Sequence, residues 1–309
     1  MAQPTNTFDS YDAVGIREDL KDVIYNISPE ETPFYTKSSK TTARNTLVEW
    51  QTDSLRASAA NAHIEGDATS AEARGATTRL GNYTQIFKNA VIVPDTDEGV
   101  DKAGRAKEVA YQTLKIAKEQ KLDIEAALFD NNVQVAGNST TARELSGVPT
   151  WVATNVEIGT GIAAVSSRDG TDAYTVGTTQ TLSQADFDSV MQQVWASGGN
   201  PDTVYLSGSH MARAIDDTNG FVGNNNQRST ITAEAEKVIK HMDVYVTPWG
   251  TVEFVPSREI TSQPAGTAPS YVFIAQDDKW KVANLRATKN VPLAKTGDST
   301  KRQVVTELT

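Results

Sequence analysis

Three histidines, His63, His210 and His241, are by residue type the best candidates in this chain for acid–base chemistry or metal binding. They lie far apart in the sequence and show neither HExxH nor another paired spacing, whereas the ligands of a metal site must converge. His210 stands in the first turn of a predicted helix, where capping or packing explains it better than metal binding. The chain has no cysteine, which excludes disulfides, thiolate metal sites and cysteine nucleophiles. Because a GxSxG motif is also absent, we predict no metal site and no catalytic residues.

Two segments superficially match nucleotide-binding motifs. The segment 159–164 (GTGIAA) fits the loose pattern GxGxxA, but a poor buried strand precedes it and a polar turn follows too soon for a helix. The segment 295–301 (KTGDSTK) lacks the GK[ST] order and the upstream glycine of a phosphate loop. We therefore predict no cofactor and no enzymatic activity. A soluble α/β enzyme built on residues 183–216 remains the alternative from a different functional class.

The 309-residue chain is acidic, with a net charge of −10 and a pI near 4.9. A protein whose main task is to grip nucleic-acid phosphates needs a basic face, so the overall charge disfavours that function. The N-terminus lacks the features of a secretion signal, and no apolar run approaches the length that spans a bilayer. We expect a cytosolic protein, or a particle assembled in the cytosol.

Residues 97–129 are predicted to form one long helix. This segment contains no proline, and its two glycines lie near its start. A helix of 33 residues would be about 50 Å long. Charges throughout exclude a membrane span, and Lys121 interrupts the apolar stripe that a coiled coil would need. The apolar residues at helical spacing are Val100, Ala103, Ala106, Ala110, Leu114, Ala117, Ile124 and Leu128.

Residues 45–93 are predicted to form a long hairpin. Its first strand lies within 45–55, and its second begins at Asn82, in a segment rich in aromatic and β-branched residues. The 26 residues between the strands, 56–81, show no periodicity. A loop of this length in a compact domain is usually functional or flexible. It is either a disordered excursion or a flap that becomes ordered against another subunit.

Residues 1–40 read as an arm. Isolated apolar residues are scattered among polar ones, a short helix is possible at 19–25, and Phe34 and Tyr35 follow a proline. Such an arm either folds back on its own domain or docks on a neighbouring subunit, and both alternatives stay open.

The second half of the chain predicts an α/β unit followed by short strands. Ser183 and Asp186 have capping-box spacing at the start of a helix over 183–197, and a strand at 203–207 leads into a helix at 210–216. The other expected elements are a turn into a strand at 147–152, an Asn/Gly-rich loop at 216–228, a hairpin at 243–256, and strands at 271–275, 279–285 and 303–308.

Taken in order, these segments resemble the major capsid proteins of tailed bacteriophages, which have the Hong Kong 97-like fold. The similarity is greatest to the branch typified by the phage SU-ten head protein, and it covers nearly the whole chain. Besides the long helix and the hairpin, the segments that carry it are 28–34 (SPEETPF), 49–55 (EWQTDSL), 79–86 (RLGNYTQI), 206–210 (LSGSH), 255–258 (VPSR) and 293–298 (LAKTGD).

The resemblance implies an α+β fold in four parts. These are an N-terminal arm (1–40), an extended loop or E-loop (41–90), a peripheral domain (91–146 with 260–309) that holds the spine helix 97–129, and an axial domain (147–259). In such a shell the loop 216–228 would point toward the symmetry axis of a capsomer.

The implied function is that of a major capsid (head) protein. It would self-assemble into pentamers and hexamers of an icosahedral shell that encloses double-stranded DNA without sequence-specific binding. Its partners would be other copies of itself and, in addition, a separate scaffolding protein, a portal and a decoration protein, with no membrane involved. Its location would be the virion, assembled in the host cytoplasm. A prophage-derived, encapsulin-like nanocompartment shell of the same fold is the alternative within this class.

Some relatives lock their shells through a covalent bond from an extended-loop lysine. Here no lysine lies between Lys40 and Lys88, so we predict a non-covalent shell. The residues expected to contact neighbouring subunits are Phe34, Tyr35, Trp50, Arg56, Arg74, Arg79, Asn219, Phe221, Asn224 and Arg228.

Overall fold

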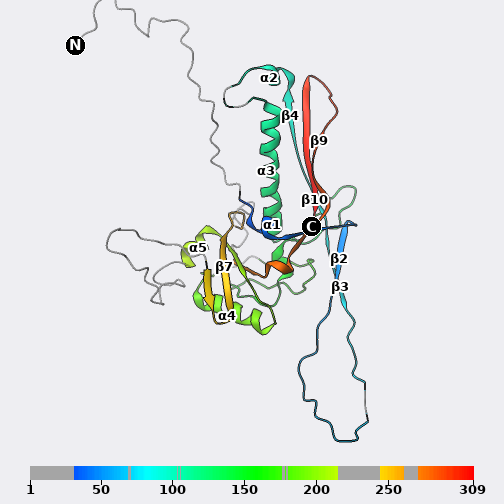
Figure 1. Ribbon diagram of the computed structural model, residues 1–309, viewed down its shortest axis with the longest axis vertical. Helices are drawn as coiled ribbons and strands as arrows, with labels where there is room; N and C mark the ends of the chain where they lie inside the picture. The colour runs from blue at the N-terminus through cyan, green and yellow to red at the C-terminus, as the bar shows by residue number, and fades with distance from the viewer. Residues whose placement is uncertain are drawn as a thin grey trace, which may run out of the picture.

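The computed structural model describes residues 31–68, 71–102, 104, 106–175, 178, 180–214, 244–260 and 271–309. Two long extensions leave a common body in opposite directions: one holds the longest helix and three long strands, and the other is a two-stranded ribbon (Figure 1). The fold is α+β, as predicted. The helix expected at 19–25 and the loop expected at 216–228 lie outside the described residues.

The strands of the first extension belong to a four-stranded sheet of order β1-β9-β10-β4. β10 is antiparallel to both β9 and β4, whereas β1 pairs in parallel with the start of β9. The predicted strands at 279–285 and 303–308 are confirmed within β9 and β10, which are both longer than expected. The bounds are β1 (Ser39–Thr42), β9 (Lys281–Pro292), β10 (Ser299–Leu308) and β4 (Gln85–Pro94).

The long helix α3 spans Glu108–Phe129, so the predicted spine helix 97–129 is wrong in its first part. A separate short helix, α2 (Asp95–Gly99), precedes it, and Gly104 between the two helices has a φ of +78°. A residue in this left-handed conformation interrupts a right-handed helix. With 22 residues, α3 is about 33 Å long.

Side chains on both helices hold the corner between α2 and α3. The Glu98 carboxylate accepts the backbone N–H groups of Glu108 and Val109 at 3.0 and 3.1 Å, and so satisfies donors that the start of α3 would leave unpaired. Lys102 contacts the carboxylates of Asp97 and Glu108 at 2.6 and 3.0 Å. The break in the predicted helix is therefore a defined corner.

The ribbon consists of β2 (Leu47–Thr52) and β3 (Thr78–Tyr83), paired antiparallel from Leu47 opposite Tyr83 to Thr52 opposite Thr78. The predicted hairpin is confirmed, but most of its assigned second strand is wrong. β3 ends at Tyr83, and the strand that follows, β4, pairs with β10 in the larger sheet. The change of sheet takes place at a single residue, Thr84.

A second four-stranded sheet, of order β6-β7-β5-β8, forms the body beside the point where the two extensions meet. The predicted α/β unit and the hairpin are confirmed in it. Residues 147–152, expected to enter a strand, instead form a 3-10 helix, η1 (Val148–Trp151), with a proline in its first turn. The other bounds are α4 (Gln184–Ala196), β5 (Thr203–Leu206), α5 (Gly208–Ala214), β6 (Val244–Thr247), β7 (Gly250–Pro256) and β8 (Phe273–Ala275).

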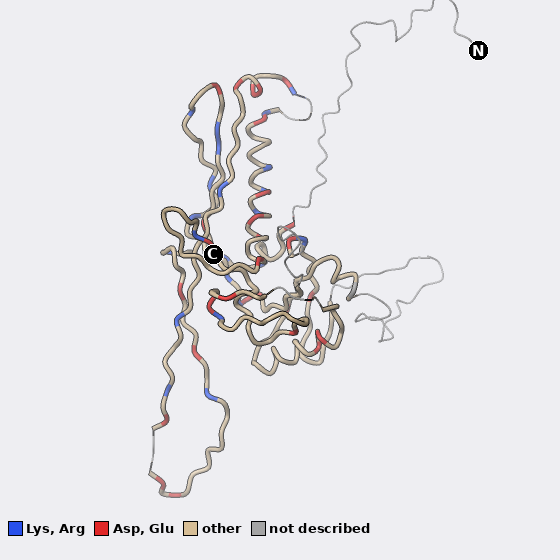
Figure 2. The backbone as a smooth tube through the Cα atoms, turned by 180° about the vertical axis from the view of Figure 1, so that it is seen from behind, with Lys and Arg blue, Asp and Glu red and all other residues tan. Residues whose placement is uncertain are grey.

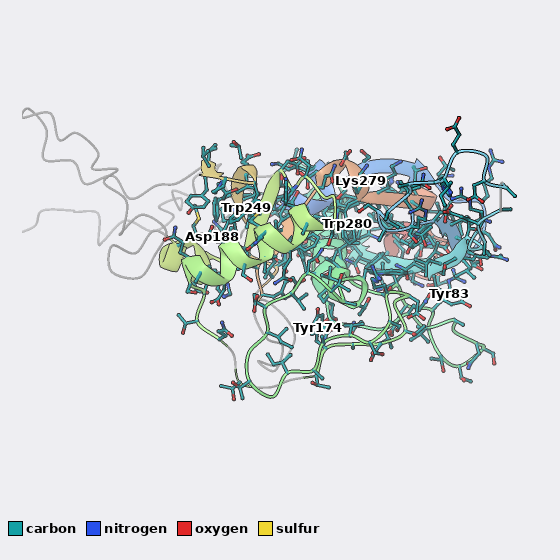
Figure 3. The ribbon with its side chains drawn as sticks, turned by 90° about the horizontal axis from the view of Figure 1, so that it is seen from below. Tyr83, Tyr174, Asp188, Trp249, Lys279 and Trp280 are labelled. Atoms are coloured by element: carbon teal, nitrogen blue, oxygen red, sulfur yellow. The ribbon has the colours of Figure 1, made fainter. Side chains whose placement is uncertain are left out.

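The helix α4 covers one side of this second sheet. Its N-cap, Ser183, accepts the backbone N–H of Asp186 at 3.2 Å, as the capping-box spacing predicts. Phe187 and Met191 of α4 are buried against β5 and β7. Trp249, in the β6–β7 turn, packs against the same core beside α4 (Figure 3).

The register of the β6–β7 hairpin differs from the prediction, in which Val244 and Val246 faced Val252 and Phe254. Val244 is paired with Glu253, so the two β6 valines lie on the opposite face from the two β7 residues. Val252 and Phe254 are buried, whereas Val244 and Val246 are exposed.

The end of the arm is fixed to the C-terminal part of α3. In α1 (Pro33–Lys37), the backbone N–H groups of Phe34 and Tyr35 donate to the Glu125 carboxylate at 3.0 and 2.7 Å. The ring of Phe34 lies 5.0 Å from that of Phe129 and 5.2 Å from that of Tyr205, measured between centroids. Glu125 itself is completely buried, so α1 covers an ionisable group within the core.

We predict that the stability conferred by Glu125 decreases as the pH rises. Burial, followed by repulsion from Glu259, raises its pKa to about 7, against the opposing effects of the two amide N–H groups and Lys40. Because the folded state then binds the proton more tightly than the unfolded state, the stabilisation is complete below the ordinary pKa of 4.5 and is lost as the pH rises through about 7.

The measurement is the free energy of unfolding in urea between pH 5 and pH 8. We expect the wild-type chain to lose on the order of 2 kcal/mol more over this range than a Glu125→Gln variant, which cannot ionise. Equal pH dependence in the two proteins would contradict the assignment.

Candidate assembly surfaces

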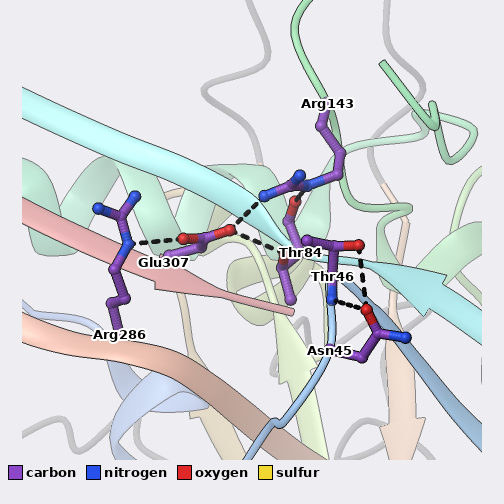
Figure 4. Close-up of polar contacts among 6 residues, drawn as sticks. All are labelled: Asn45, Thr46, Thr84, Arg143, Arg286 and Glu307. Carbon is purple, nitrogen blue, oxygen red and sulfur yellow. Dashed lines mark hydrogen bonds and ion pairs between the residues drawn. The ribbon is translucent and has the colours of Figure 1, made fainter. Parts of the chain in front are cut away.

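Thr84 is the residue at which the ribbon joins the larger sheet, and all of its polar groups are engaged. Its N–H donates to the Thr46 carbonyl at 2.8 Å, and its carbonyl accepts the Arg143 Nε–H at 2.5 Å. Its hydroxyl donates to Glu307 Oε1 at 3.1 Å (Figure 4). Since Thr84 is also completely buried, the direction in which the ribbon leaves the sheet is fixed.

Glu307 is a buried carboxylate between two arginines. One oxygen accepts from Arg143 and the other from Arg286 Nε at 2.6 Å, so both guanidinium groups face a single negative charge (Figure 4). Buried charges are tolerated when they are paired and hydrogen-bonded in this way. We call Thr84, Arg143, Arg286 and Glu307 the junction.

A second set of contacts fixes the base of the ribbon to the loop that follows α3. The Asn82 side chain donates to the Ser146 carbonyl at 3.3 Å and accepts the Ser146 N–H at 3.0 Å. On the other strand, the ring of Trp50 packs against that of Trp151, with 5.2 Å between centroids. Both strands of the ribbon are therefore supported where they leave the body.

Beyond this base the ribbon and the described part of its tip, residues 53–68 and 71–77, project away from the rest of the chain (Figure 1). Leu55 and Ile64 in the tip are 98% and 84% exposed. In the described part of the chain β2 and β3 pair only with each other, so each has an outer edge whose backbone groups are free to pair. An isolated chain gains nothing from large apolar side chains held out in water, whereas a partner surface could cover them.

Most of the predicted contact residues that the structure describes lie on this ribbon. Arg56 pairs with Glu72 at 3.0 Å in the tip, and Arg79 pairs with Glu49 across the two strands. Arg74 is exposed.

Of the two aromatic residues predicted at the end of the arm, Phe34 is 3% exposed and belongs to the core of its own chain. We therefore correct the prediction that its side chain contacts a neighbouring subunit. Tyr35 is half-buried, and Lys40 Nζ lies 3.7 Å from the centroid of its ring. The remaining predicted contacts, Asn219, Phe221, Asn224 and Arg228, lie outside the described residues.

The junction and Glu125 are the polar groups on which this geometry depends, and the sequence pattern did not reveal them. Glu307 stands in a strand that alternates in the usual way, and Arg143 stands in a loop without a motif. In the sequence Glu307 lies 164 residues from Arg143 and 21 residues from Arg286, so no local spacing links these residues. The one available signal is Glu125, a charged residue beside the apolar stripe of the predicted helix.

A cavity of about 360 Å³ lies between α4, β8 and the loop after η1. Apolar side chains such as Val190, Val194 and Ile158 dominate its lining, and Tyr174 and Trp280 also line it (Figure 3).

The ionisable groups of the cavity are already engaged. The Asp186 carboxylate accepts the Ser183 hydroxyl at 2.6 Å in the helix cap, and the His210 ring lies 2.8 Å from the Ser207 hydroxyl. Burial lowers the pKa of His210 and so favours the neutral ring. Ser207 is completely buried and also accepts the backbone N–H of His210 at 3.4 Å, so its contact with His210 belongs to the start of α5.

Neither a metal site nor a membrane span is found in the described ranges. No group of three or more potential metal ligands comes together there. None of the helices described is both long and apolar enough to cross a bilayer.

Comparison with known proteins gives matches over the whole chain. The family model for the SU10 major capsid protein matches residues 3–309. The major capsid protein of Escherichia phage Phieco32 is 26% identical over 343 residues, which cover 100% of this chain and 94% of the relative.

Solved capsid structures share the fold. The capsid of a native GTA particle superposes with a TM-score of 0.60 at 10% identity, covering 97% of this chain and 92% of that one. A chain of Microbacterium phage Oxtober96 also gives a TM-score of 0.60, at 12% identity, covering 97% and 91%. These likenesses show the Hong Kong 97-like fold.

We predict that breaking the junction destabilises the fold far more than breaking an exposed ion pair. A Glu307→Gln variant leaves two guanidinium groups without their carboxylate and should lose about 2 kcal/mol of unfolding free energy in urea. The control is Glu72→Gln, which removes the exposed partner of Arg56 and should change stability by less than about 0.5 kcal/mol. Similar small losses in the two variants would refute a special role for the junction.

Proposed function

Because the chain belongs to the SU10 major capsid protein family, we propose that it assembles with copies of itself into pentamers and hexamers of an icosahedral shell around double-stranded DNA. The observation that carries the proposal is the ribbon: a two-stranded extension with an exposed apolar tip, held away from the body by a buried ionic junction. A surface of this kind is useful only when another molecule covers it.

The strand edges and the apolar tip of the ribbon can both form contacts between subunits. Free strand edges can pair with a neighbouring chain through backbone hydrogen bonds. The apolar side chains of the tip can in addition be buried against the surface of that chain. Each such contact is weak by itself. In a closed shell every further contact is made within an assembly that already exists, so many weak contacts add up to a stable particle.

We assign four functional parts to the chain. Residues 1–40 are the arm, 41–90 the extended loop that contains the ribbon, 91–146 with 260–309 the peripheral domain around α3, and 147–259 the axial domain around the smaller sheet. Tyr35, Trp50, Arg56, Arg74 and Arg79 are the described residues that we expect at contacts between subunits.

The family match supports a phage head over both an encapsulin-like compartment and a soluble α/β enzyme. The chain would thus act as a structural protein of the virion, assembled in the host cytoplasm. It would enclose DNA without reading its sequence. A separate scaffolding protein, a portal and a decoration protein are the partners expected beyond further copies of the chain.

The proposal is tested by expressing the full chain with any scaffolding protein encoded beside its gene. We expect closed shells of megadalton mass by sedimentation and electron microscopy. A monomer or small oligomer under all such conditions would overturn the proposal.

We predict that the shell is held together without covalent bonds between subunits. No lysine lies between Lys40 and Lys88, so the tip of the ribbon cannot supply an amine for cross-linking. Purified particles should therefore give a single band near 33.4 kDa in denaturing electrophoresis. A ladder of covalent oligomers would contradict this prediction.

We also predict that the apolar tip is needed for assembly but not for folding. A Leu55→Ser/Ile64→Ser variant removes two side chains that touch little in the single chain, so thermal stability should stay the same while the yield of particles falls about tenfold or more. Leu114→Ser on α3, also at an exposed position, is the matched control and should assemble normally. Normal assembly of the double variant would show that the tip is dispensable.

A further inference from the structure

The cavity beside α4 is lined by residues of two separate hydrophobic cores. Phe129 and Phe273 of its wall belong to the core that contains the end of α3, whereas Phe187 and Ile274 belong to the core between α4 and the smaller sheet. Small-molecule sites occur preferentially between packing units of this kind, and they have volumes upward of ~300 Å³. The volume of about 360 Å³ lies in that range.

The outer wall of the cavity is an irregular segment that side chains fix at both ends. At one end, within residues 155–162, the Glu157 carboxylate accepts the Ser189 hydroxyl of α4 at 2.6 Å. At the other end, the Asn131 side chain donates to the Tyr174 carbonyl at 2.8 Å and accepts the Tyr174 N–H at 3.0 Å. The wall is therefore attached both to α4 and to the chain that follows α3.

Two parts of this wall are also bound to each other. The Thr178 N–H donates to the Thr160 carbonyl at 3.0 Å. A Cβ atom at Gly159 would lie 2.1 Å from the Thr178 carbonyl oxygen, so the close approach requires a glycine at this position. Long segments without helix or strand in a compact domain are usually functional. The wall is thus a built structure that spans the cavity without filling it.

The inner surface of the cavity is apolar and rich in aromatic rings. Aliphatic side chains come from α4 and from the outer wall. The hydroxyl of Tyr271 donates to the Phe129 carbonyl at 2.5 Å, and that of Tyr174 donates to the Val152 carbonyl, so both tyrosines have their polar groups engaged. Apolar cavities bind small apolar molecules, and aromatic rings pack favourably with one another. The aromatic residues that line the cavity are Phe129, Tyr174, Phe187, Tyr271, Phe273 and Trp280.

The charged groups around the cavity disfavour an anionic ligand. Glu157 and Asp186 contribute two carboxylates to the lining, and no lysine or arginine is found among the described residues that form it. His210 supplies no lasting positive charge, since burial favours its neutral ring. An anion would leave water without gaining a cation, which is costly. The ligand that fits is therefore uncharged.

We propose that this cavity binds an uncharged small molecule with an aromatic body. The bound molecule would contact α4, β8 and the end of α3 at once, and would bury its rings against both cores. Because it binds only the folded chain, it would raise the stability of the body in proportion to its concentration. The inference does not depend on the proposed self-assembly.

Two fluorescent probes with almost the same ring skeleton test the charge and the shape of the ligand. N-phenyl-1-naphthylamine is uncharged, whereas 8-anilino-1-naphthalenesulfonate carries an added sulfonate. With the full-length chain in solution, we expect saturable binding of one uncharged probe per chain, about tenfold or more tighter than the sulfonate, and a rise in unfolding temperature. Equal affinities, or no saturable binding of the uncharged probe, would overturn the proposal.

Substitutions that fill the cavity test where the probe binds. Val190→Trp extends a side chain of α4 into the cavity and should weaken binding of the uncharged probe about tenfold or more. The matched control is Gln192→Trp, which lies at an exposed position of the same helix outside the cavity and should bind normally.

Ile158→Trp fills the cavity from the outer wall and serves if the helix variant does not fold. Ile158 is exposed, so the core does not depend on it. Unfolding temperatures identify the variants that fold. Wild-type affinity in a folded cavity-filling variant would contradict the assignment.

The same titration on intact particles separates a small molecule from a neighbouring subunit as the occupant. Binding both to free chains and to particles supports the proposal. Binding to free chains that is lost in particles would mean that a second copy fills the cavity, and the proposal would be wrong. Failure of the chain to form particles counts against the proposed function alone, because the titration of free chains still decides this inference.

Discussion

The arrangement of the whole chain depends on one buried carboxylate. Glu307 faces Arg143 and Arg286 and accepts the hydroxyl of Thr84, the residue at which the backbone passes from the ribbon into the larger sheet. A junction made of charge-assisted bonds has one favourable geometry, because the buried Glu307 carboxylate would be costly to leave without its donors. The junction therefore helps to hold the two extensions in opposite directions, beside the apolar core that packs α3, β4 and β10 against the body. A subunit built in this way reaches far from its own centre while using few residues.

The same economy leaves surfaces that a single chain cannot satisfy. The tip of the ribbon holds Leu55 and Ile64 in water, and the larger sheet presents the exposed residues Ile92 and Val291 beside lysines that form no ion pair with a described residue. In a monomeric protein such surfaces would be a liability, but in a shell they are where copies meet. Membership in a capsid family and the exposed geometry of the ribbon thus have a common explanation.

Local patterns predicted the elements well, and long-range polar contacts account for most of what they missed. The cap at Ser183 and the strands predicted at 203–207 and 271–275 follow from neighbouring residues and were found correctly. The length of the spine helix was not, because the sequence does not show that Gly104 adopts a left-handed conformation. The partner strand of β4 and the role of Glu307 depend on residues more than a hundred positions away. Phe34 was misassigned because the local sequence, an aromatic residue after a proline, does not distinguish a residue of an arm from a residue of the core.

The most direct measurement of the central claim is amide hydrogen exchange in residues 53–77, compared between intact particles and chains dissociated from them. If the junction holds the ribbon out so that neighbouring copies cover it, exchange in this segment should slow by about tenfold or more on assembly, while exchange in α3 changes little. Equally fast exchange in both states would mean that the ribbon lies free in the particle, and would contradict the account.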